Sequence, residues 1–167
     1  SVVAIFQDNI KRMLAYSSIA QIGYMILGIS MGSIAGLTAA ILHLFNHALM
    51  KGGLFLALGC IAYQIGGVRL GALAGSGRRI PWTMAAFLIG SLSLIGVPLT
   101  AGFISKWFII EAALAQGWWP VLIVVIAGSF LSLLYVWRVV EMAYLRHPSK
   151  AGNAATEAPL SLLAPTW

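Results

Sequence analysis

The chain has 167 residues, of which 60% are hydrophobic and only 8% are charged. Ordinary globular chains are about one quarter charged, so this composition excludes a soluble fold. The formal net charge of +6 comes from ten lysines and arginines that are scattered between apolar segments. They form no basic face of the kind that binds nucleic acid, so nucleic acid is excluded as a partner.

Four apolar runs are long enough to cross a bilayer, which takes about 20 residues. The sequence therefore predicts an all-α, polytopic transmembrane helix bundle with four spans and the start of a fifth. The spans are expected at about Met13–Met31, Ile34–Ile65, Pro81–Leu114 and Trp119–Leu145, followed by a polar linker and a further helix start over 146–167. The second and third runs exceed a ~30 Å hydrocarbon core, so they are expected to tilt, project or break.

Both ends of the sequence suggest an interior piece of a larger membrane protein. The first residues, "SVVAIFQDNIKR", contain no basic stretch that leads into an apolar core, as a signal peptide would. The last residues, "APLSLLAPTW", begin another apolar run and end before it could cross a bilayer.

The basic loop residues fall on one side of the predicted spans. The turns on the opposite side, near Gly32 and over 116–118, carry no lysine or arginine. By the positive-inside rule, the loops 66–80 and 146–159 are therefore predicted to be cytoplasmic. The residues that decide this orientation are Lys11, Arg12, Arg69, Arg78, Arg79, Arg146 and Lys150.

The second span carries three titratable residues at four-residue intervals, which places His43, His47 and Lys51 on one helix face. A charge inside a membrane costs a few kcal/mol, so an ionisable group there is a candidate functional site. A neutral imidazole can accept a proton at one nitrogen and donate from the other, and a buried lysine can change its charge. His43, His47 and Lys51, called the row below, are therefore predicted to form a proton relay. The alternative is that the histidines only bond neighbouring helices.

The third span is interrupted by Gly96, Pro98 and Gly102, shortly before Lys106. Proline removes a backbone donor and clashes with the preceding turn, and glycines weaken a helix, so a break is predicted near Val97–Ala101. Broken helices mark ion sites in transporters. A packed proline kink is the alternative interpretation. Because Lys106 lies about one turn beyond the break, it is predicted to be the fourth residue of the relay.

Four further polar residues in the spans are accessory candidates. Asn46 is either a hydrogen-bonding partner in the relay or a contact between two helices. Glu111 is either functional or an interfacial anchor. Arg138 and Glu141 lie one turn apart near the end of the last span, where we expect them to pair with each other.

Several other classes of protein fit poorly, and no metal ion or cofactor is predicted. A helical metalloprotease site needs H-E-x-x-H, whereas "HLFNH" has Leu44 in place of the glutamate. Axial haem ligands would face each other across helices, whereas the histidine pair lies on one helix. No G-x-x-x-x-G-K-[ST] loop is present, so ATP is not the energy source within this segment.

Three long segments carry a family resemblance. They are "QDNIKRMLAYSSIAQIGYMILGI", "LHLFNHALMKGGLFL" and "GVPLTAGFISKW". In order and spacing they resemble the antiporter-like membrane subunits shared by Mrp-type monovalent cation/proton antiporters, NADH:quinone oxidoreductase (complex I) and membrane-bound hydrogenases. Two later segments, "YVWRVVEMAYLR" and "EAPLSLLAPTW", are most similar to the D-type subunits of the Mrp antiporters.

The resemblance implies that the chain is a C-terminal fragment holding helices ten to thirteen of a fourteen-helix subunit. It places Lys106 on the broken twelfth helix, and His43, His47 and Lys51 on the eleventh, along a hydrated axis. The family's other essential groups, a glutamate on helix five and lysines on helices seven and eight, lie outside this sequence.

The function expected from the resemblance is proton translocation in a Na⁺/proton or K⁺/proton antiporter of a bacterial inner membrane, together with other membrane subunits. Na⁺ or K⁺ would be the exchanged ion, but few oxygen ligands line the spans to hold it. A proton-pumping subunit of a complex I-like enzyme or of a membrane-bound hydrogenase is the first alternative. A structural membrane subunit without an ion path of its own is the second.

Overall fold

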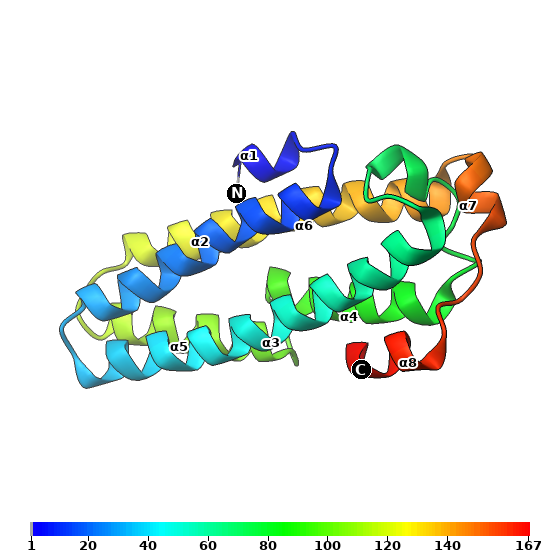
Figure 1. Ribbon diagram of the computed structural model, residues 1–167. Coiled ribbons are helices and arrows are strands. Elements are labelled where there is room, and N and C mark those ends of the chain that lie inside the picture. Colours follow the sequence, from blue (N-terminus) through cyan, green and yellow to red (C-terminus); the bar gives the residue numbers. More distant parts are fainter. Residues whose placement is uncertain (1) are drawn as a thin grey trace.

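The computed structural model describes residues 2–167, and over this range the regular elements are all helices (Figure 1). Three long helices, α2 (Ile10–Ser30), α3 (Ile34–Ile65) and α6 (Pro120–Leu145), are long and apolar enough to cross a membrane. The remaining crossing is made of two helices, α4 (Pro81–Ile95) and α5 (Ala101–Leu114). The predicted all-α polytopic bundle with one broken span is confirmed. The short elements are α1 (Val2–Ile5), η1 (Leu70–Leu73), α7 (Lys150–Ala154), α8 (Leu160–Leu163) and η2 (Ala164–Thr166).

Helix α3 is the centre of the bundle and packs against α2, α4 and α5. Ser33 caps its first turn by accepting a hydrogen bond from the Gly36 backbone at 3.1 Å. Gly66 ends the helix in the left-handed conformation, which glycine adopts at little cost. The 32 residues of α3 span about 48 Å at 1.5 Å per residue, and the helix runs its full length without a break.

Helices α2 and α3 approach each other closely where two glycines meet. A Cβ atom added to Gly36 would lie 2.5 Å from the carbonyl oxygen of Gly28 and 2.9 Å from Cβ of Met31. The two backbones are therefore in contact. Small residues at such crossings are the usual means by which membrane helices pack tightly.

The fourth crossing breaks where the sequence predicts. Helix α4 ends at Ile95, and Gly96 follows with a left-handed φ of +89°. Pro98 lies in the irregular turn over residues 96–100, where its missing N–H group leaves no helical hydrogen bond unmade. Thr100 then caps α5 by accepting a hydrogen bond from the Phe103 backbone at 3.3 Å.

The start of α5 is packed directly on the end of α4. The Gly102 backbone donates to the Ser93 hydroxyl at 3.1 Å. A Cβ atom on Gly102 would overlap the carbonyl oxygen of Ser93, so only glycine fits there. Glycine at this position therefore allows a close approach of the two half-helices.

The basic loops meet at one end of the bundle. The Gly75 backbone donates to the Met142 carbonyl at 3.0 Å, and the Ser149 hydroxyl donates to the Ala72 carbonyl at 2.9 Å. At the opposite end, the Gln116 side chain donates to the Met31 carbonyl at 2.9 Å. The loops 66–80 and 146–159 thus share one end, and their cytoplasmic location remains a prediction.

Two apolar clusters fill the core. The larger lies toward the basic end and includes Leu14, Leu54 and Phe87, and the smaller lies toward the opposite end and includes Ala39 and Ile109. A band of buried polar side chains separates the two clusters. Its members are Ser17, Gln21, His43, Asn46, His47, Lys51, Ser105 and Lys106.

Candidate functional site

The polar band contains all four residues predicted to form the relay. The exposed fractions of His43, His47 and Lys51 are 0%, 8% and 7%, and that of Lys106 is 4%. The first three project from α3, and Lys106 projects from α5, which packs against α3. The fold therefore brings the row on one helix and the lysine beyond the break into one buried region.

Lys106 reaches back to the end of the broken helix α4. Its Nζ donates to the carbonyl oxygens of Leu94 at 3.0 Å and Ile95 at 2.8 Å, and to the Ser129 hydroxyl of α6 at 3.0 Å. The last carbonyls of a helix have no partner within the helix, and the helix dipole favours a cation there. The break thus supplies a binding place for an ammonium group inside the bundle.

Tyr24 lies between Lys106 and the histidines. The centre of its ring is 5.6 Å from Nζ of Lys106 and 5.8 Å from the ring centre of His43. Its hydroxyl faces Gly128 of α6, where a Cβ atom would overlap the oxygen. Tyr24 is not among the residues that the sequence predicts for the site. The helical spacing of Ser17, Gln21 and Tyr24 on α2 is the signal that could have indicated it.

His43 is held by hydrogen bonds at both ring nitrogens. Its Nε2 lies 3.0 Å from Oε1 of Gln21, and its Nδ1 lies 2.8 Å from the Ser105 hydroxyl. The amide oxygen only accepts, so it takes the proton of Nε2, and Nδ1 is left as an acceptor for the hydroxyl. Because the partners fix one tautomer, His43 is the more constrained of the two histidines.

His47 has one ring nitrogen, Nδ1, that makes no hydrogen bond to the described residues. Its ring stacks near that of His43, with ring centres 6.3 Å apart and planes 15° from parallel. Its Nδ1 is buried and has no hydrogen-bond partner among residues 2–167. A buried nitrogen without a partner is uncommon, and here it is available to accept or donate a proton.

Lys51 connects the row to α2. Its Nζ donates to the Leu14 carbonyl at 2.5 Å and to the Ser17 hydroxyl. Tyr135 of α6 is also fully buried, and its hydroxyl has no partner within the described part of the chain. Polar groups therefore continue on both sides of the row, from α2 and from α6.

Asn46 joins two helices and does not bridge the histidines. Its amide donates to the Ala101 carbonyl at 2.9 Å, in the first turn of α5. Of the two interpretations of Asn46, the structure shows the contact between two helices. Glu111 is exposed toward the far end of α5 and forms no ion pair with residues 2–167.

The expected pairing of Arg138 with Glu141 is wrong. Arg138 lies 3.1 Å from the Asp8 carboxylate and also donates to the carbonyls of Ile5 and Gln7. The first carbonyl ends the short helix α1 and the second follows it, so both lack helical partners and attract the guanidinium. A helical pair contributes only a few tenths of a kcal/mol, too little to compete.

Glu141 pairs instead with Arg146 across the end of α6, with an oxygen-to-nitrogen distance of 2.7 Å. Over residues 2–167, no group of three or more His, Cys, Asp or Glu side chains is placed to hold a metal ion.

Comparison with known proteins assigns the chain to a family. The family model described as "NADH:quinone oxidoreductase/Mrp antiporter, TM" matches residues 1–132. The chain belongs to this family. The resemblance found in the sequence is therefore confirmed at the level of the antiporter-like membrane subunits.

Relatives of these antiporter-like subunits come from both branches of the family. The chain is 40% identical to NADH-quinone oxidoreductase subunit N of Desulforudis audaxviator, covering 99% of this chain and 35% of that one. A chain in the Mrp complex of Dietzia sp. DQ12-45-1b superposes with a TM-score of 0.89 at 27% identity, covering 98% and 38% of the two chains.

A chain of the membrane-bound sulfane sulfur reductase, an archaeal respiratory membrane complex, superposes with a TM-score of 0.90 at 33% identity, covering 99% of this chain and 27% of that one. The chain spans about a third of the length of the curated relatives it matches. These matches therefore include an NADH-quinone oxidoreductase subunit, a chain of a respiratory membrane complex and a chain of an Mrp complex.

Proposed function

We propose that this chain is the C-terminal part of a proton-translocating membrane subunit, and that its buried histidines and lysines carry the protons. The observation that supports this is the polar band itself. Four titratable side chains, His43, His47, Lys51 and Lys106, lie in one buried region between two apolar clusters. A membrane bundle without an ion path would have little use for so many ionisable groups at this depth.

In this proposal, Lys51 and Lys106 are the two ends of the relay, and the two histidines lie between them. Lys51 exchanges protons at the α2 side, where the Ser17 hydroxyl contacts it. His47, one turn away on α3, takes up or releases a proton at its free Nδ1. The stacked ring of His43 aligns His47 and leads to Ser105 and Lys106 on α5. Water carries protons across the steps where these groups do not touch.

Lys106 is the group whose charge changes in response to the rest of the subunit. When protonated, it is stabilised by the carbonyls of Leu94 and Ile95, at the negative end of the α4 dipole. When neutral, its amine still donates hydrogen bonds to the same carbonyls. Both states are therefore supported by one geometry, as a proton carrier requires.

For the parent complex, we propose redox-driven proton pumping of the complex I type. The 40% identity to subunit N over 99% of the chain supports this choice. A Na⁺/proton or K⁺/proton antiporter of the Mrp type is the second candidate, supported by the TM-score of 0.89 to the Mrp complex. In either case the partners are other membrane subunits, and the membrane is a bacterial inner membrane with the basic loops cytoplasmic.

The proposal is tested by neutralising the relay in the full-length protein within its complex. His47→Gln and Lys51→Met keep much of the side-chain volume and remove the titratable groups. Proton transport into proteoliposomes, followed with a pH-sensitive dye, should fall about tenfold or more, since a positioned proton-transfer group contributes roughly 100-fold or more in enzymes.

His147→Gln and Lys150→Met are the matched control, because both residues are exposed in the segment that follows α6. These variants should transport like the wild type. Normal transport with His47 and Lys51 both replaced, at equal assembly, would favour a structural subunit instead.

The driving force distinguishes the two parent complexes. In proteoliposomes without an electron donor, an imposed Na⁺ or K⁺ gradient should move protons through an antiporter. A redox-driven pump should move protons only when a reduced donor and a quinone are supplied. Proton movement driven by the cation gradient alone would support the antiporter and reject our first choice.

A further inference from the structure

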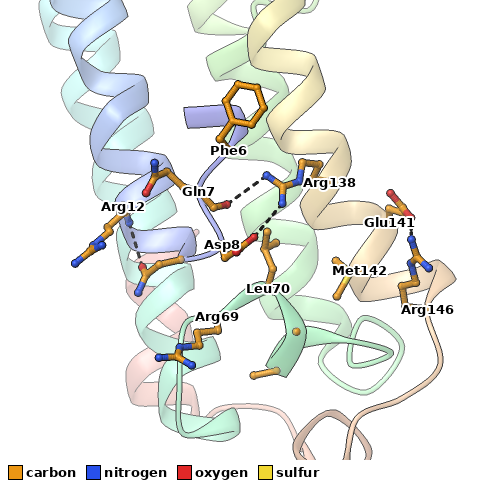
Figure 2. A pocket seen from close by; sticks show the side chains of 13 residues that line it. Phe6, Gln7, Asp8, Arg12, Arg69, Leu70, Arg138, Glu141, Met142 and Arg146 are labelled. Atoms are coloured by element: carbon orange, nitrogen blue, oxygen red, sulfur yellow. Dashed lines mark hydrogen bonds and ion pairs between the residues drawn. The ribbon is translucent and has the colours of Figure 1, made fainter. Parts of the chain in front are cut away.

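A polar cavity of about 920 Å³ opens at the basic end of the bundle. Figure 2 shows that its walls come from three places: the connection between α1 and α2, the η1 segment and the last turns of α6. Its lining includes none of His43, His47, Lys51 and Lys106, so the relay proposed above does not use it. Its lining is rich in arginine.

The charges around the cavity do not cancel. Four arginines line it, against the two carboxylates of Asp8 and Glu141. Both carboxylates are already paired, Asp8 with Arg138 and Glu141 with Arg146. Arg12 and Arg69 are left without a carboxylate partner among residues 2–167. In Figure 2 these two side chains project to the same side of the cavity.

The backbone holds Arg12 and Arg69 near each other. The Ile10 backbone donates to the Val68 carbonyl at 2.9 Å, and the Leu70 backbone donates to the Asp8 carbonyl at 2.9 Å. These bonds join the start of α2 to the segment that carries Arg69. Arg12 lies in the first turn of α2, where unpaired N–H groups and the helix dipole add further positive potential.

Two planar guanidinium groups on a fixed backbone suit a phosphate group, which they bind through paired hydrogen bonds. The cavity lies at the end of long apolar helices, which is the level of lipid headgroups. Phe6 in its lining is 76% exposed, and Val2 and Val3 on the neighbouring α1 are more than half exposed, so apolar surface adjoins the arginines. Phosphate and acyl chains of one molecule could contact both.

We propose that this cavity binds the phosphate headgroup of an anionic phospholipid, with Arg12 and Arg69 as its main ligands. Basic pockets between membrane helices are suited to such headgroups. The lipid would hold together three segments that are far apart in the sequence. Its role would be to fix the basic end of the bundle, independently of the proton path.

The test uses the purified full-length protein in detergent and native mass spectrometry. Cardiolipin, phosphatidylglycerol, phosphatidylcholine and inorganic phosphate are titrated separately, and inorganic phosphate is then added in competition with each lipid. The double variant Arg12→Gln/Arg69→Gln should weaken binding of the two anionic lipids about 30-fold, since each arginine near the surface contributes about 1 kcal/mol. The matched control is Lys11→Gln/Arg78→Gln, which removes the same charge from exposed positions outside the cavity.

Anionic lipids that bind in preference to phosphatidylcholine, with loss in the cavity variant but not in the control, would support the proposal. Equal losses in both variants would overturn it in favour of diffuse attraction to a basic surface. Binding of inorganic phosphate that competes fully with lipid would identify a free anion as the ligand. A protein segment seen in the cavity by electron microscopy of the complex in a nanodisc would likewise overturn the lipid assignment.

Discussion

The sharpest prediction concerns Lys106, whose charge must come and go if it carries protons. We compare Lys106→Ala, which removes the titratable group, with Lys106→Arg, which keeps a positive charge that is practically never released. If proton exchange is its role, both variants should lose nearly all transport. If the residue is only a fixed counter-charge, arginine should restore it.

The contacts of Lys106 show why its charged form is within reach. Insertion scales put the cost of a lysine at the membrane centre at about 2.5–3.5 kcal/mol. Hydrogen bonds to a charged group contribute about 1.5–3 kcal/mol each, and Nζ makes three of them, to Leu94, Ile95 and Ser129. Their sum, about 4.5–9 kcal/mol, offsets the burial cost. Lys106→Ala should therefore also destabilise the break by about 1–3 kcal/mol for each carbonyl left unsatisfied.

The assay is proton uptake by proteoliposomes at matched expression, together with the thermal stability of each purified variant. Lys106→Ala should lose both transport and stability, whereas Lys106→Arg should keep most of the stability because a guanidinium can still donate to the carbonyls. Transport near the wild-type rate in Lys106→Arg would refute the reasoning. Lys150→Arg, at an exposed position, controls for the exchange of lysine for arginine itself.

Two further predictions address packing and topology. Gly36→Ala should lower the stability of the bundle by about 1–3 kcal/mol, because the new methyl group would force α2 and α3 apart. Thermal denaturation in detergent measures this loss. The control is Gly52→Ala, where a Cβ atom meets nothing within 4 Å, and it should have little effect. For the topology, cysteines are introduced in a background without the native cysteine, at exposed positions. Gly71→Cys and Ala154→Cys at the basic end should resist an impermeant thiol reagent in intact cells and react in inverted vesicles. Ala115→Cys at the other end should react in intact cells and resist the reagent in inverted vesicles. Labelling of the first two in intact cells would contradict the cytoplasmic assignment.

The elements of the bundle were predictable because their signals are local. Apolar length gives the long helices, and α3 has the bounds Ile34–Ile65 expected for the second run. The break was predictable from Gly96, Pro98 and Gly102, since each has a direct effect on backbone geometry. The shared buried face of His43, His47 and Lys51 was predictable because these residues repeat at helical spacing.

Contacts between distant segments were not predictable in the same way. Nothing near Arg138 in the sequence indicates that α1 would present free carbonyls to it, so a neighbouring acid was the natural partner to expect. Tyr24 likewise reads as one aromatic residue in an apolar helix. Its spacing from Ser17 and Gln21 indicates a shared helix face, but its place between Lys106 and His43 depends on how α2, α3 and α5 cross.

The break and the lysine form a single unit. Gly96 ends α4 and leaves its last carbonyls free, and those carbonyls bind the Lys106 ammonium. A Cβ atom on Gly96 would lie 3.1 Å from Cδ of Lys106, so the glycine also makes room for the side chain. Asn46 and Ser93 tie the start of α5 to α3 and α4. We therefore expect a change of charge at Lys106 to alter the force between the two half-helices. Ser105, the residue beside it, contacts His43, so the row on α3 adjoins this unit.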